Sequence, residues 1–516
     1  MSLVPHHPTC EVAIVGMGPT GVMLAHLLGA LGVVTVLIDR EPDLLNLPRA
    51  VHFDGEVMRI FQNAGLATAL LPHVRASQGM QYINPQGQLL LERKPANAAG
   101  MHGWANNYLF HQPDVERILR DGLAAHPSVQ VRLQHEVTDL QATPAGVDIV
   151  MTDLGHNSPQ RLHAQWVVGC DGARSKVREH MATGSDDLGL HQAWLVIDVE
   201  LRQDLDLPVA TVQYCDPARP ITYVNVTGRR RRWEVMVMPG DTLADMIHPQ
   251  HIWPLLSPWI APHQAQLVRT AIYTFHSLLT QHWRQGRLLL AGDSAHQTPP
   301  FLGQGMCAGI RDAANLAWKL HRVCRGAPDT LLDTYASERI PHVNDFIATA
   351  VKLGNIIQST DPMVAAQRDR QFLTQGPQEI VNLSPPLGPG FHRGQGLSGH
   401  ITAQPTLSDG RLLDDALGLG FAVISARAVD TSRMPAQTLK YLTALGVQWL
   451  HDPVLEAWLK ELGAQWVLLR PDRYVFATAQ TTDEMTHWDL SLALTQNHPQ
   501  IPDTHTKPTS LQESTA

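Results

Sequence analysis

A glycine-rich turn between an apolar strand and an apolar helix most constrains the fold of this 516-residue chain. Residues 11–15 predict a buried strand, and residues 19–31 predict a helix. Between them, Gly16, Gly18 and Gly21 follow the spacing G-x-G-x-x-G. In a βαβ unit these glycines permit a tight turn, close approach of a pyrophosphate and packing of the helix on the sheet. We therefore expect a Rossmann-type α/β domain at the start.

An acidic residue at the end of the next predicted strand limits which dinucleotides the turn can bind. Residues 34–38 predict that strand, and Asp39 follows it, 21 residues after Gly18. A carboxylate there accepts hydrogen bonds from ribose hydroxyls and would repel a 2′-phosphate. The site is expected to bind FAD or NAD, with the pyrophosphate at the helix N-terminus. The alternative is a glycine-rich turn that holds no ligand.

The apolar stretch from 21 to 38 is long enough to suggest a membrane helix. Its glycine spacing and the β-branched run at 33–36 favour a buried helix followed by a buried strand. A net charge of −9 argues against nucleic acid and against anionic membrane surfaces. Five cysteines without C-x-x-C spacing fit a reducing compartment. We expect a cytoplasmic protein that binds no membrane, nucleic acid or metal.

Two further motifs lie downstream. Residues 288–291 predict a buried strand that leads into Gly292 and Asp293, and a proline- and glycine-containing turn follows before a helix predicted over 309–323. A carboxylate at a strand end, followed by such a turn, can hold a hydroxylated anionic chain, although a capped helix without a ligand is the alternative. The other motif, residues 169–175, contains Asp171 and Arg174.

The three motifs, in this order, resemble the signature of flavoprotein aromatic hydroxylases, the single-component FAD monooxygenases of the p-hydroxybenzoate hydroxylase type. Further stretches are similar to the 3-(3-hydroxyphenyl)propionate / 3-hydroxycinnamate hydroxylase branch of that family. They are residues 48–50, 111–113, 215–220, 231–240, 311–320 and 332–339. The resemblance extends over most of the chain and is weakest in the stretch before the C-terminal region.

The resemblance implies a bound FAD, with NADH or NADPH as a transient electron donor. A flavin C4a-hydroperoxide would hydroxylate a phenolic substrate with O2, converting 3-(3-hydroxyphenyl)propionate to its 2,3-dihydroxy product. Three alternatives remain open. They are hydroxylation of another phenol, such as a resorcinol or a polyketide aromatic, a flavin-binding reductase without hydroxylase activity, and a plain NAD-dependent dehydrogenase.

The resemblance also assigns roles to individual positions. Catalytic roles are expected for Arg49 and Pro300 beside the flavin. His52 follows Arg49 closely and could help to deprotonate the phenol, with an ordinary structural histidine as the alternative. Many members of the family carry Glu in place of Asp39. The expected cofactor-binding residues are Val15, Gly16, Gly18, Pro19, Thr20, Gly21, Asp39, Arg40, Arg49, Gln112, Asp171, Gly292, Asp293, Pro300, Gly303, Gln304, Gly305 and Met306.

The expected architecture is a Rossmann-type FAD-binding domain with an inserted, mostly antiparallel β-sheet substrate domain and a C-terminal thioredoxin-like domain. No cysteine follows Cys324, so the last domain is expected to be structural and to assist a homodimer. The four arginines at 229–232 predict a solvated hairpin tip, with an anion-binding patch as the alternative. The predicted divisions are 1–185 and 285–383 for the FAD-binding domain, 186–284 for the substrate sheet, 384–409 for a linker, 410–490 for the thioredoxin-like domain and 491–516 for a disordered tail.

Overall fold

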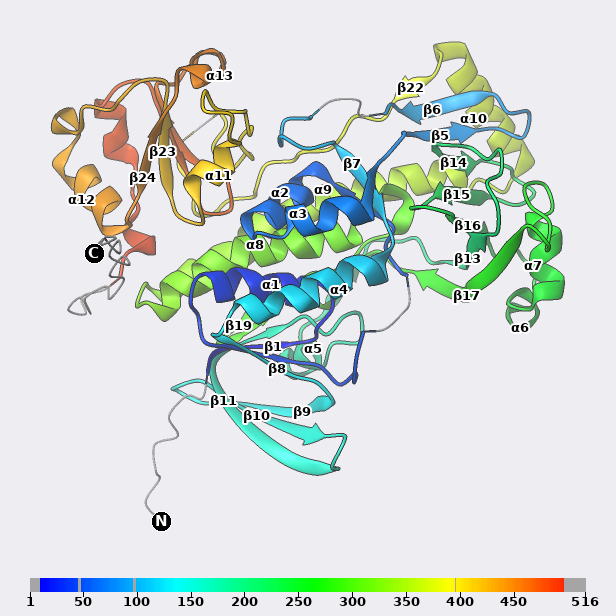
Figure 1. The fold of residues 1–516 in the computed structure, drawn as a ribbon, viewed down its shortest axis with the longest axis horizontal. Coiled ribbons are helices and arrows are strands. Elements are labelled where there is room, and N and C mark those ends of the chain that lie inside the picture. Colours follow the sequence, from blue (N-terminus) through cyan, green and yellow to red (C-terminus); the bar gives the residue numbers. More distant parts are fainter. Residues whose placement is uncertain (1–9, 45–47, 96–98, 395, 496–516) are drawn as a thin grey trace, which may run out of the picture.

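The computed structural model describes residues 10–44, 48–95, 99–394 and 396–495. Two long helices, α8 (Gly305–Cys324) and α9 (Asp333–Ile357), run through the centre of the molecule, and three β-rich units surround them (Figure 1). The helix predicted over 309–323 is thus confirmed, and it begins one turn earlier.

The first unit is the predicted dinucleotide-binding sheet. Its strands lie in the order β19-β20-β11-β1-β2-β8, all parallel except β19. The strand order proceeds from β1 to β2 on one side and to β11 on the other. Folds of this kind bind ligands at the carboxyl end of the strand at such a point. The strands are β1 (Cys10–Val15), β2 (Thr35–Ile38), β8 (Val129–Arg132), β11 (Ser158–Gly169), β19 (Arg284–Gln285) and β20 (Leu288–Leu290), and β9 (His135–Ala142) and β10 (Val147–Asp153) form an antiparallel extension on β11.

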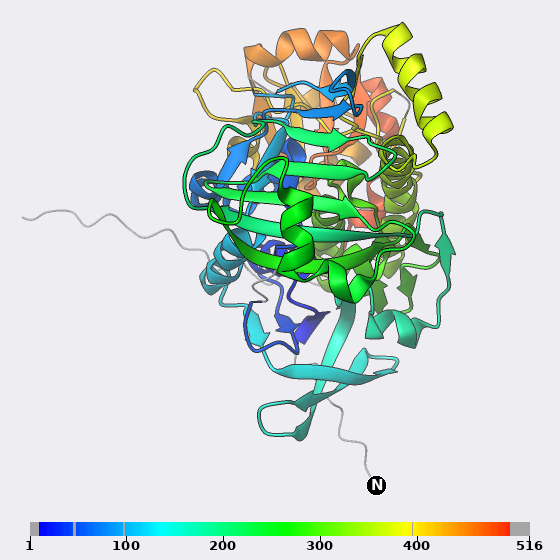
Figure 2. The ribbon, with the colours of Figure 1, turned by 90° about the vertical axis from the view of Figure 1, so that its right-hand side faces the viewer.

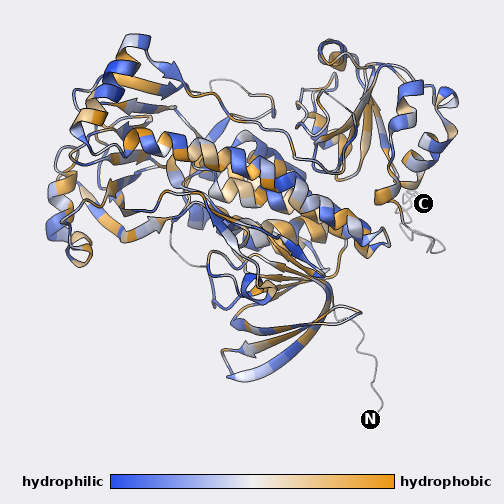
Figure 3. Ribbon diagram, turned by 180° about the vertical axis from the view of Figure 1, so that it is seen from behind, coloured by the Kyte–Doolittle hydropathy of each residue, from blue (hydrophilic) through white to orange (hydrophobic). Residues whose placement is uncertain are grey.

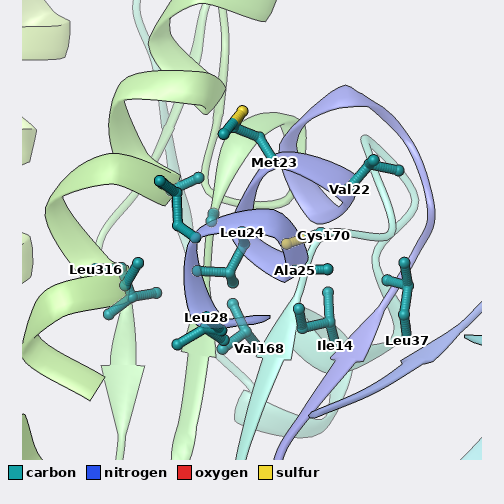
Figure 4. Packing of buried hydrophobic residues seen from close by; sticks show 14 of the residues in the cluster. Ile14, Val22, Met23, Leu24, Ala25, Leu28, Leu37, Val168, Cys170 and Leu316 are labelled. Atoms are coloured by element: carbon teal, nitrogen blue, oxygen red, sulfur yellow. The ribbon is translucent and has the colours of Figure 1, made fainter. Parts of the chain in front are cut away.

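Helix α1 (Pro19–Ala30) lies between this sheet and α8. Leu24 and Leu28 are fully buried with Ile14 and Val168 of the sheet and Leu316 of α8 (Figure 4). Because both sides of α1 are covered, it is apolar all round, which is why the sequence resembles a membrane span. The predicted helix followed by a strand is confirmed. No described helix is long and apolar enough to cross a membrane.

The second unit is an eight-stranded sheet, which we call the chamber sheet. Its order is β17-β13-β16-β15-β14-β5-β6-β22, and it extends beyond the predicted 186–284 segment. Strand β5 joins it by parallel pairing with β14, a long-range contact that no local pattern encodes. The strands are β5 (Met80–Ile83), β6 (Leu89–Arg93), β13 (Gln192–Leu201), β14 (Thr211–Tyr214), β15 (Ile221–Asn225), β16 (Arg230–Met236), β17 (Ala265–Phe275) and β22 (Gln378–Glu379).

One face of the chamber sheet is covered by helix α7 (Pro249–Leu256), which crosses the strands in Figure 2. Leu195, Tyr223 and Trp233 point to this face and are buried with Ile252 of the helix. Successive side chains of a strand point to opposite faces. The residues that alternate with these therefore face the dinucleotide-binding unit.

The third unit has the thioredoxin-like topology expected at the C-terminus, with the sheet order β24-β23-β25-β26. Buried ion pairs dock it, joining Arg59 to Asp414 (2.7 Å) and Arg470 to Glu338 (2.8 Å). Apolar residues concentrate in its strands (Figure 3). Of the predicted tail, residues 491–493 form a short 3-10 helix, and residues 496–516 lie outside the described residues. The strands and helices are β23 (Ala422–Ser425), β24 (Gln448–His451), β25 (Trp466–Leu469), β26 (Val475–Ala479), α11 (Leu413–Leu417), α12 (Ala436–Ala444) and α13 (Glu456–Glu461).

Candidate active site

A cavity of about 620 Å³ lies between the dinucleotide-binding sheet and the chamber sheet. All three sequence motifs contribute to it, although they are far apart along the chain. Sixteen of the expected site residues line it: Gly16, Gly18, Pro19, Thr20, Asp39, Arg40, Arg49, His52, Gln112, Asp171, Asp293, Pro300, Gly303, Gln304, Gly305 and Met306.

Three expected residues, Val15, Gly21 and Gly292, are not among the cavity-lining residues. Val15 is the buried last residue of β1. A Cβ on Gly21 would lie 2.0 Å from the backbone oxygen of Gly16, and one on Gly292 would lie 2.6 Å from Oγ1 of Thr20. Gly21 and Gly292 therefore allow α1 and the turns at Gly16 and Gly292 to pack closely behind the cavity wall.

Two helix N-termini open onto the cavity. Gly18 precedes α1 and Gln304 precedes α8, and neither helix has a side-chain cap at this end. A Cβ added to Gly18 or Gly305 would meet no atom within 4 Å, so both positions border open space. Uncapped backbone N–H groups and the positive end of each helix dipole attract anions and other acceptors. Their arrangement on one cavity fits an elongated, anionic cofactor such as FAD.

Asp39 stabilises the first glycine turn. Its two carboxylate oxygens accept hydrogen bonds from the backbone N–H groups of Met17 (2.5 Å) and Glu41 (2.8 Å). Each oxygen retains a further lone pair for a ribose hydroxyl. Asp39, which is shorter than the Glu of many family members, therefore both stabilises the turn and lines the cavity.

Asp171 joins the second motif to the third. Its carboxylate accepts hydrogen bonds from Oγ of Ser175 (2.5 Å), Oγ of Ser294 (3.1 Å) and the backbone N–H of Lys176 (2.6 Å). Ser294 follows Asp293, whose carboxyl also lines the cavity. Burial raises the pKa of Asp293, although the charges of His296 and Arg49 oppose this shift. The contacts of Asp171 hold Asp293 and its turn in place.

The loop that carries Arg49 is fixed from two sides. The amide oxygen of Gln112 accepts hydrogen bonds from the backbone N–H groups of Arg49 (2.8 Å) and Ala50 (2.5 Å). Arg232 of the chamber sheet donates to the backbone oxygen of Arg49 (2.7 Å) and pairs with Asp198 (2.7 Å). The prediction of a fully solvated arginine tip is therefore wrong for Arg232. Strand β16 already begins at Arg230, and strand alternation turns Arg232 inward.

Both ring nitrogens of His52 face protein oxygen acceptors, and a neutral ring can donate to only one of them at a time. Its Nε2 lies 2.8 Å from Oδ1 of Asn107 and its Nδ1 lies 3.1 Å from the backbone oxygen of Gly303. The Asn107 oxygen is oriented because it also accepts from Arg93 (3.3 Å), while the Asn107 amide nitrogen donates to Asn382 (3.1 Å). Burial, reinforced by the Arg93 charge, lowers the pKa of His52. This geometry argues against the expected role of His52 as a base and gives it a role in positioning the Gly303 turn.

A buried polar chain that sequence reasoning missed holds Gln304. Asp54 accepts hydrogen bonds from Gln304 (2.9 Å) and Arg311 (2.5 Å), and Arg311 also donates to Glu56 (2.6 Å). Tyr474 of the C-terminal unit donates to Glu56 (2.9 Å). Burial alone would raise the pKa of Asp54, but the Arg311 guanidinium overcomes this effect and lowers it to about 2. The chain connects the third unit to the cavity.

The chamber sheet supplies the other wall of the cavity through alternate residues of its strands. Gln213, Thr222 and Glu234 are neighbours on adjacent strands, and Gln213 accepts a hydrogen bond from Thr222 (2.5 Å). Burial raises the pKa of Glu234. Sequence reasoning missed these residues. The signal was present in the alternation of these strands with apolar residues that pack on α7.

The chain matches the family model described as FAD binding domain over residues 9–350. It is 36% identical over 496 residues to a probable NADH-specific resorcinol 4-hydroxylase of Rhodococcus jostii, with 92% of this chain and 93% of that protein covered. It is 32% identical over 523 residues to a 3-(3-hydroxy-phenyl)propionate/3-hydroxycinnamic acid hydroxylase of Escherichia coli, with 91% and 92% covered.

Solved structures share the fold. Aklavinone-11 hydroxylase in complex with FAD and aklavinone superposes with a TM-score of 0.80 at 21% identity, covering 95% of this chain and 99% of that one. The flavin-dependent monooxygenase PieE, in complex with FAD and substrate, gives 0.79 at 19% identity, with 94% and 99% covered. The chain therefore belongs to the FAD binding domain family and is an FAD-dependent aromatic monooxygenase of the flavoprotein hydroxylase type.

Proposed function

We propose that this enzyme hydroxylates a small phenolic acid with bound FAD, NADH and O2, and that 3-(3-hydroxyphenyl)propionate is its first candidate substrate. One observation carries the proposal: two uncapped helix N-termini and one face of the chamber sheet line the same cavity. The similarity to the Escherichia coli hydroxylase supports the choice of substrate. NADH is proposed as the donor because the Rhodococcus jostii relative is described as NADH-specific.

Different residues of the cavity would bind different parts of FAD. The turn from Gly16 to Thr20, with Asp39, would hold the ADP half of FAD, and Asp293 with residues 303–306 would hold the flavin half. When bound, FAD accepts a hydride from the nicotinamide donor and activates oxygen for transfer to the ring. The protein orients Arg49 through Gln112 and Arg232.

Resorcinol is a second candidate substrate. The Rhodococcus jostii relative, whose name specifies resorcinol, is 36% identical. The row formed by Gln213, Thr222 and Glu234 also lines the cavity, and its oxygens could accept a hydrogen bond from a second ring hydroxyl. The two candidates differ in charge, because only the phenylpropionate carries a carboxylate at neutral pH.

The test is NADH oxidation by the purified yellow protein with each phenol separately, with the products identified by mass spectrometry. We expect 3-(3-hydroxyphenyl)propionate to accelerate NADH oxidation and to yield the 2,3-dihydroxy product. Faster oxidation with hydrogen peroxide as the main product would mark that phenol as a non-substrate effector. If neither phenol is hydroxylated, the proposed activity is wrong, although the protein remains a flavoprotein.

A further inference from the structure

Two arginines of the chamber sheet line the cavity, and they differ in their partners. Arg232 is neutralised by Asp198, with an N–O distance of 2.7 Å. Arg93, the last residue of β6, has no carboxylate within ion-pair distance among the described residues, although only 7% of it is exposed. A buried cation without a counter-ion is costly to a folded protein.

The hydrogen bonds of Arg93 are also incomplete. Its Nη1 donates to Oδ1 of Asn107 (3.3 Å), and its Nε is buried without a hydrogen-bond partner. Two acidic groups act on its charge: the Tyr82 hydroxyl, which is neutral at ordinary pH, and the Asp54 carboxylate, which is already bonded to Arg311 and Gln304. Arginine stays charged in proteins and presents a planar fork that matches a carboxylate. The guanidinium of Arg93 is therefore a charged group at the cavity wall whose hydrogen-bond donors are not all used.

The surroundings of Arg93 suit an aromatic ring. In the chamber sheet Arg93 pairs with Met80 of β5, which also lines the cavity. Leu109 lies two residues from Asn107 on strand β7 (Asn107–Phe110) of a separate small sheet and lines the cavity as well. Glu234 would repel an anion, but it lies on β16, four strands away at about 4.8 Å per strand.

We propose that Arg93 binds the carboxylate of the phenolic substrate and thereby selects aryl carboxylates over neutral phenols. This inference rests on the proposed hydroxylation of a phenol in the same cavity. It names the cation that a propionate side chain requires, and it makes Arg93 a specificity-determining residue.

The test compares four proteins on two substrates that differ only at the end of the side chain, which is a carboxylate in one and a neutral alcohol in the other. The proteins are the FAD-loaded wild type, Arg93→Met, Arg93→Lys and Lys94→Gln. The substrates are 3-(3-hydroxyphenyl)propionate and the neutral 3-(3-hydroxyphenyl)propan-1-ol. Lys94 is the matched control because it is adjacent in sequence, exposed and bonded to Glu379 (2.9 Å), so its loss removes the same charge outside the cavity.

Charge-assisted hydrogen bonds of this kind justify a loss of roughly 10- to 100-fold in kcat/KM for the acid in Arg93→Met. The alcohol should react as it does with the wild type, Arg93→Lys should recover part of the loss, and Lys94→Gln should match the wild type on both substrates. A binding measurement without turnover is the second readout: 3-phenylpropionate, which lacks the phenolic hydroxyl, should perturb the flavin spectrum of the wild type and not that of Arg93→Met.

The thermal stability of Arg93→Met separates this role from a structural one. Because the variant removes a buried, unpaired cation, its melting temperature should be equal to or above that of the wild type. Equal losses on both substrates, loss of FAD or a wild type that prefers the alcohol would each overturn the role of Arg93. If the wild type hydroxylates neither phenol, the proposed function itself fails, and the 3-phenylpropionate titration still decides whether Arg93 binds a carboxylate.

Discussion

The two halves of the cavity are built in different ways. The nucleotide half, around Gly16, Gly18 and Asp39, consists of turns and helix N-termini, each formed by a few consecutive residues. The chamber half consists of every second residue of several strands, brought together by pairing between segments as distant as β5 and β14. A site made of turns is therefore encoded in short motifs, whereas a site on a sheet face is encoded only in the pairing of whole strands.

The halves also differ in how charge is handled. The nucleotide half offers backbone N–H groups, which need no counter-ion. The chamber half places arginines under the loop of Pro48 and Arg49: Arg232 and Arg269 both donate to the backbone oxygen of Pro48, and both lie near Asp198. Buried ion pairs thus connect the chamber half to the loop over the nucleotide half. The comparison predicts that the two halves respond differently to substitution.

The largest effect is expected for Gly18→Val in the nucleotide half. A side chain at this position enters open cavity space, since a Cβ there meets no atom within 4 Å. The variant should fold like the wild type yet purify without flavin, because the new methyl groups occupy the space where a pyrophosphate would approach. The absorbance spectrum of the purified protein measures the flavin, and thermal unfolding followed by circular dichroism measures the fold.

Gly420→Val is the matched control. Gly420 also borders open space, but it lies in the C-terminal unit outside the cavity. This variant should stay yellow. A Gly18→Val protein that retains its flavin would break the comparison, because the glycine turn would then not be part of the cofactor site.

Local patterns were sufficient to predict the nucleotide half. The strand, turn and helix around Gly18 depend on contacts within about twenty residues. The cap of the helix α2 (Gly55–Asn63) is an equally local contact, since Asp54 accepts a hydrogen bond from the N–H of Val57 (3.1 Å). The order of the three motifs was enough to indicate that they converge on one cavity. Each of these signals is a residue type, such as glycine in a tight turn or aspartate before a helix, that is favoured by only a few backbone geometries.

The remainder depends on contacts between distant segments. Arg232 was interpreted as part of a solvated turn because its partner Asp198 is 34 residues away on another strand. His52 was proposed as a base because the sequence could not show that Asn107 and Gly303 occupy both ring nitrogens. Arg93 carried no motif at all. A side chain's charge and type are local properties, but its availability is set by neighbours that only the fold brings together.

The next effect in size concerns the link between the halves. Arg232→Met leaves the buried carboxylate of Asp198 with Arg269 alone, at 3.6 Å, and removes the donors to Pro48 and Arg49. Breaking a buried pair in this way typically costs about 3–5 kcal/mol of unfolding free energy. Urea unfolding should show this loss, and the remaining folded protein should still bind FAD. Loss of flavin without loss of stability would contradict the division into two halves.

A partner substitution sharpens that result. The double variant Arg232→Met with Asp198→Leu also removes the carboxylate of Asp198, so part of the stability should return, as it does when a buried pair is replaced by apolar residues. The rest should stay lost, because Glu234 loses Arg232 (3.6 Å) and Arg269 loses Asp198 (3.6 Å) in this variant. The donors to the Arg49 loop stay absent in both variants. Activity should therefore stay low in the double variant, which separates the stabilising role of the ion pair from the positioning of Arg49.

The smallest effect is the acid dependence of stability at Asp54, which holds Gln304 at the cavity wall. The pKa of the carboxyl in the folded protein is about 2, below its ordinary value of 3.8, because Arg311 favours the ionised form despite burial. Ionised Asp54 therefore stabilises the fold at pH values above 3.8, and this contribution is lost as the pH falls toward 2. The shift corresponds to about 2 kcal/mol.

Urea unfolding of Asp54→Asn should show a deficit of this order at pH 6 that narrows below pH 4. Other buried acids titrate in both proteins and cancel in the difference, and Asp121→Asn, at an exposed position of α4 (Gln112–Gly122), should show no deficit. A deficit that stays constant from pH 6 to pH 2 would show that the Asp54 carboxyl contributes through its shape and capping bond, and that its charge interaction with Arg311 does not stabilise the fold.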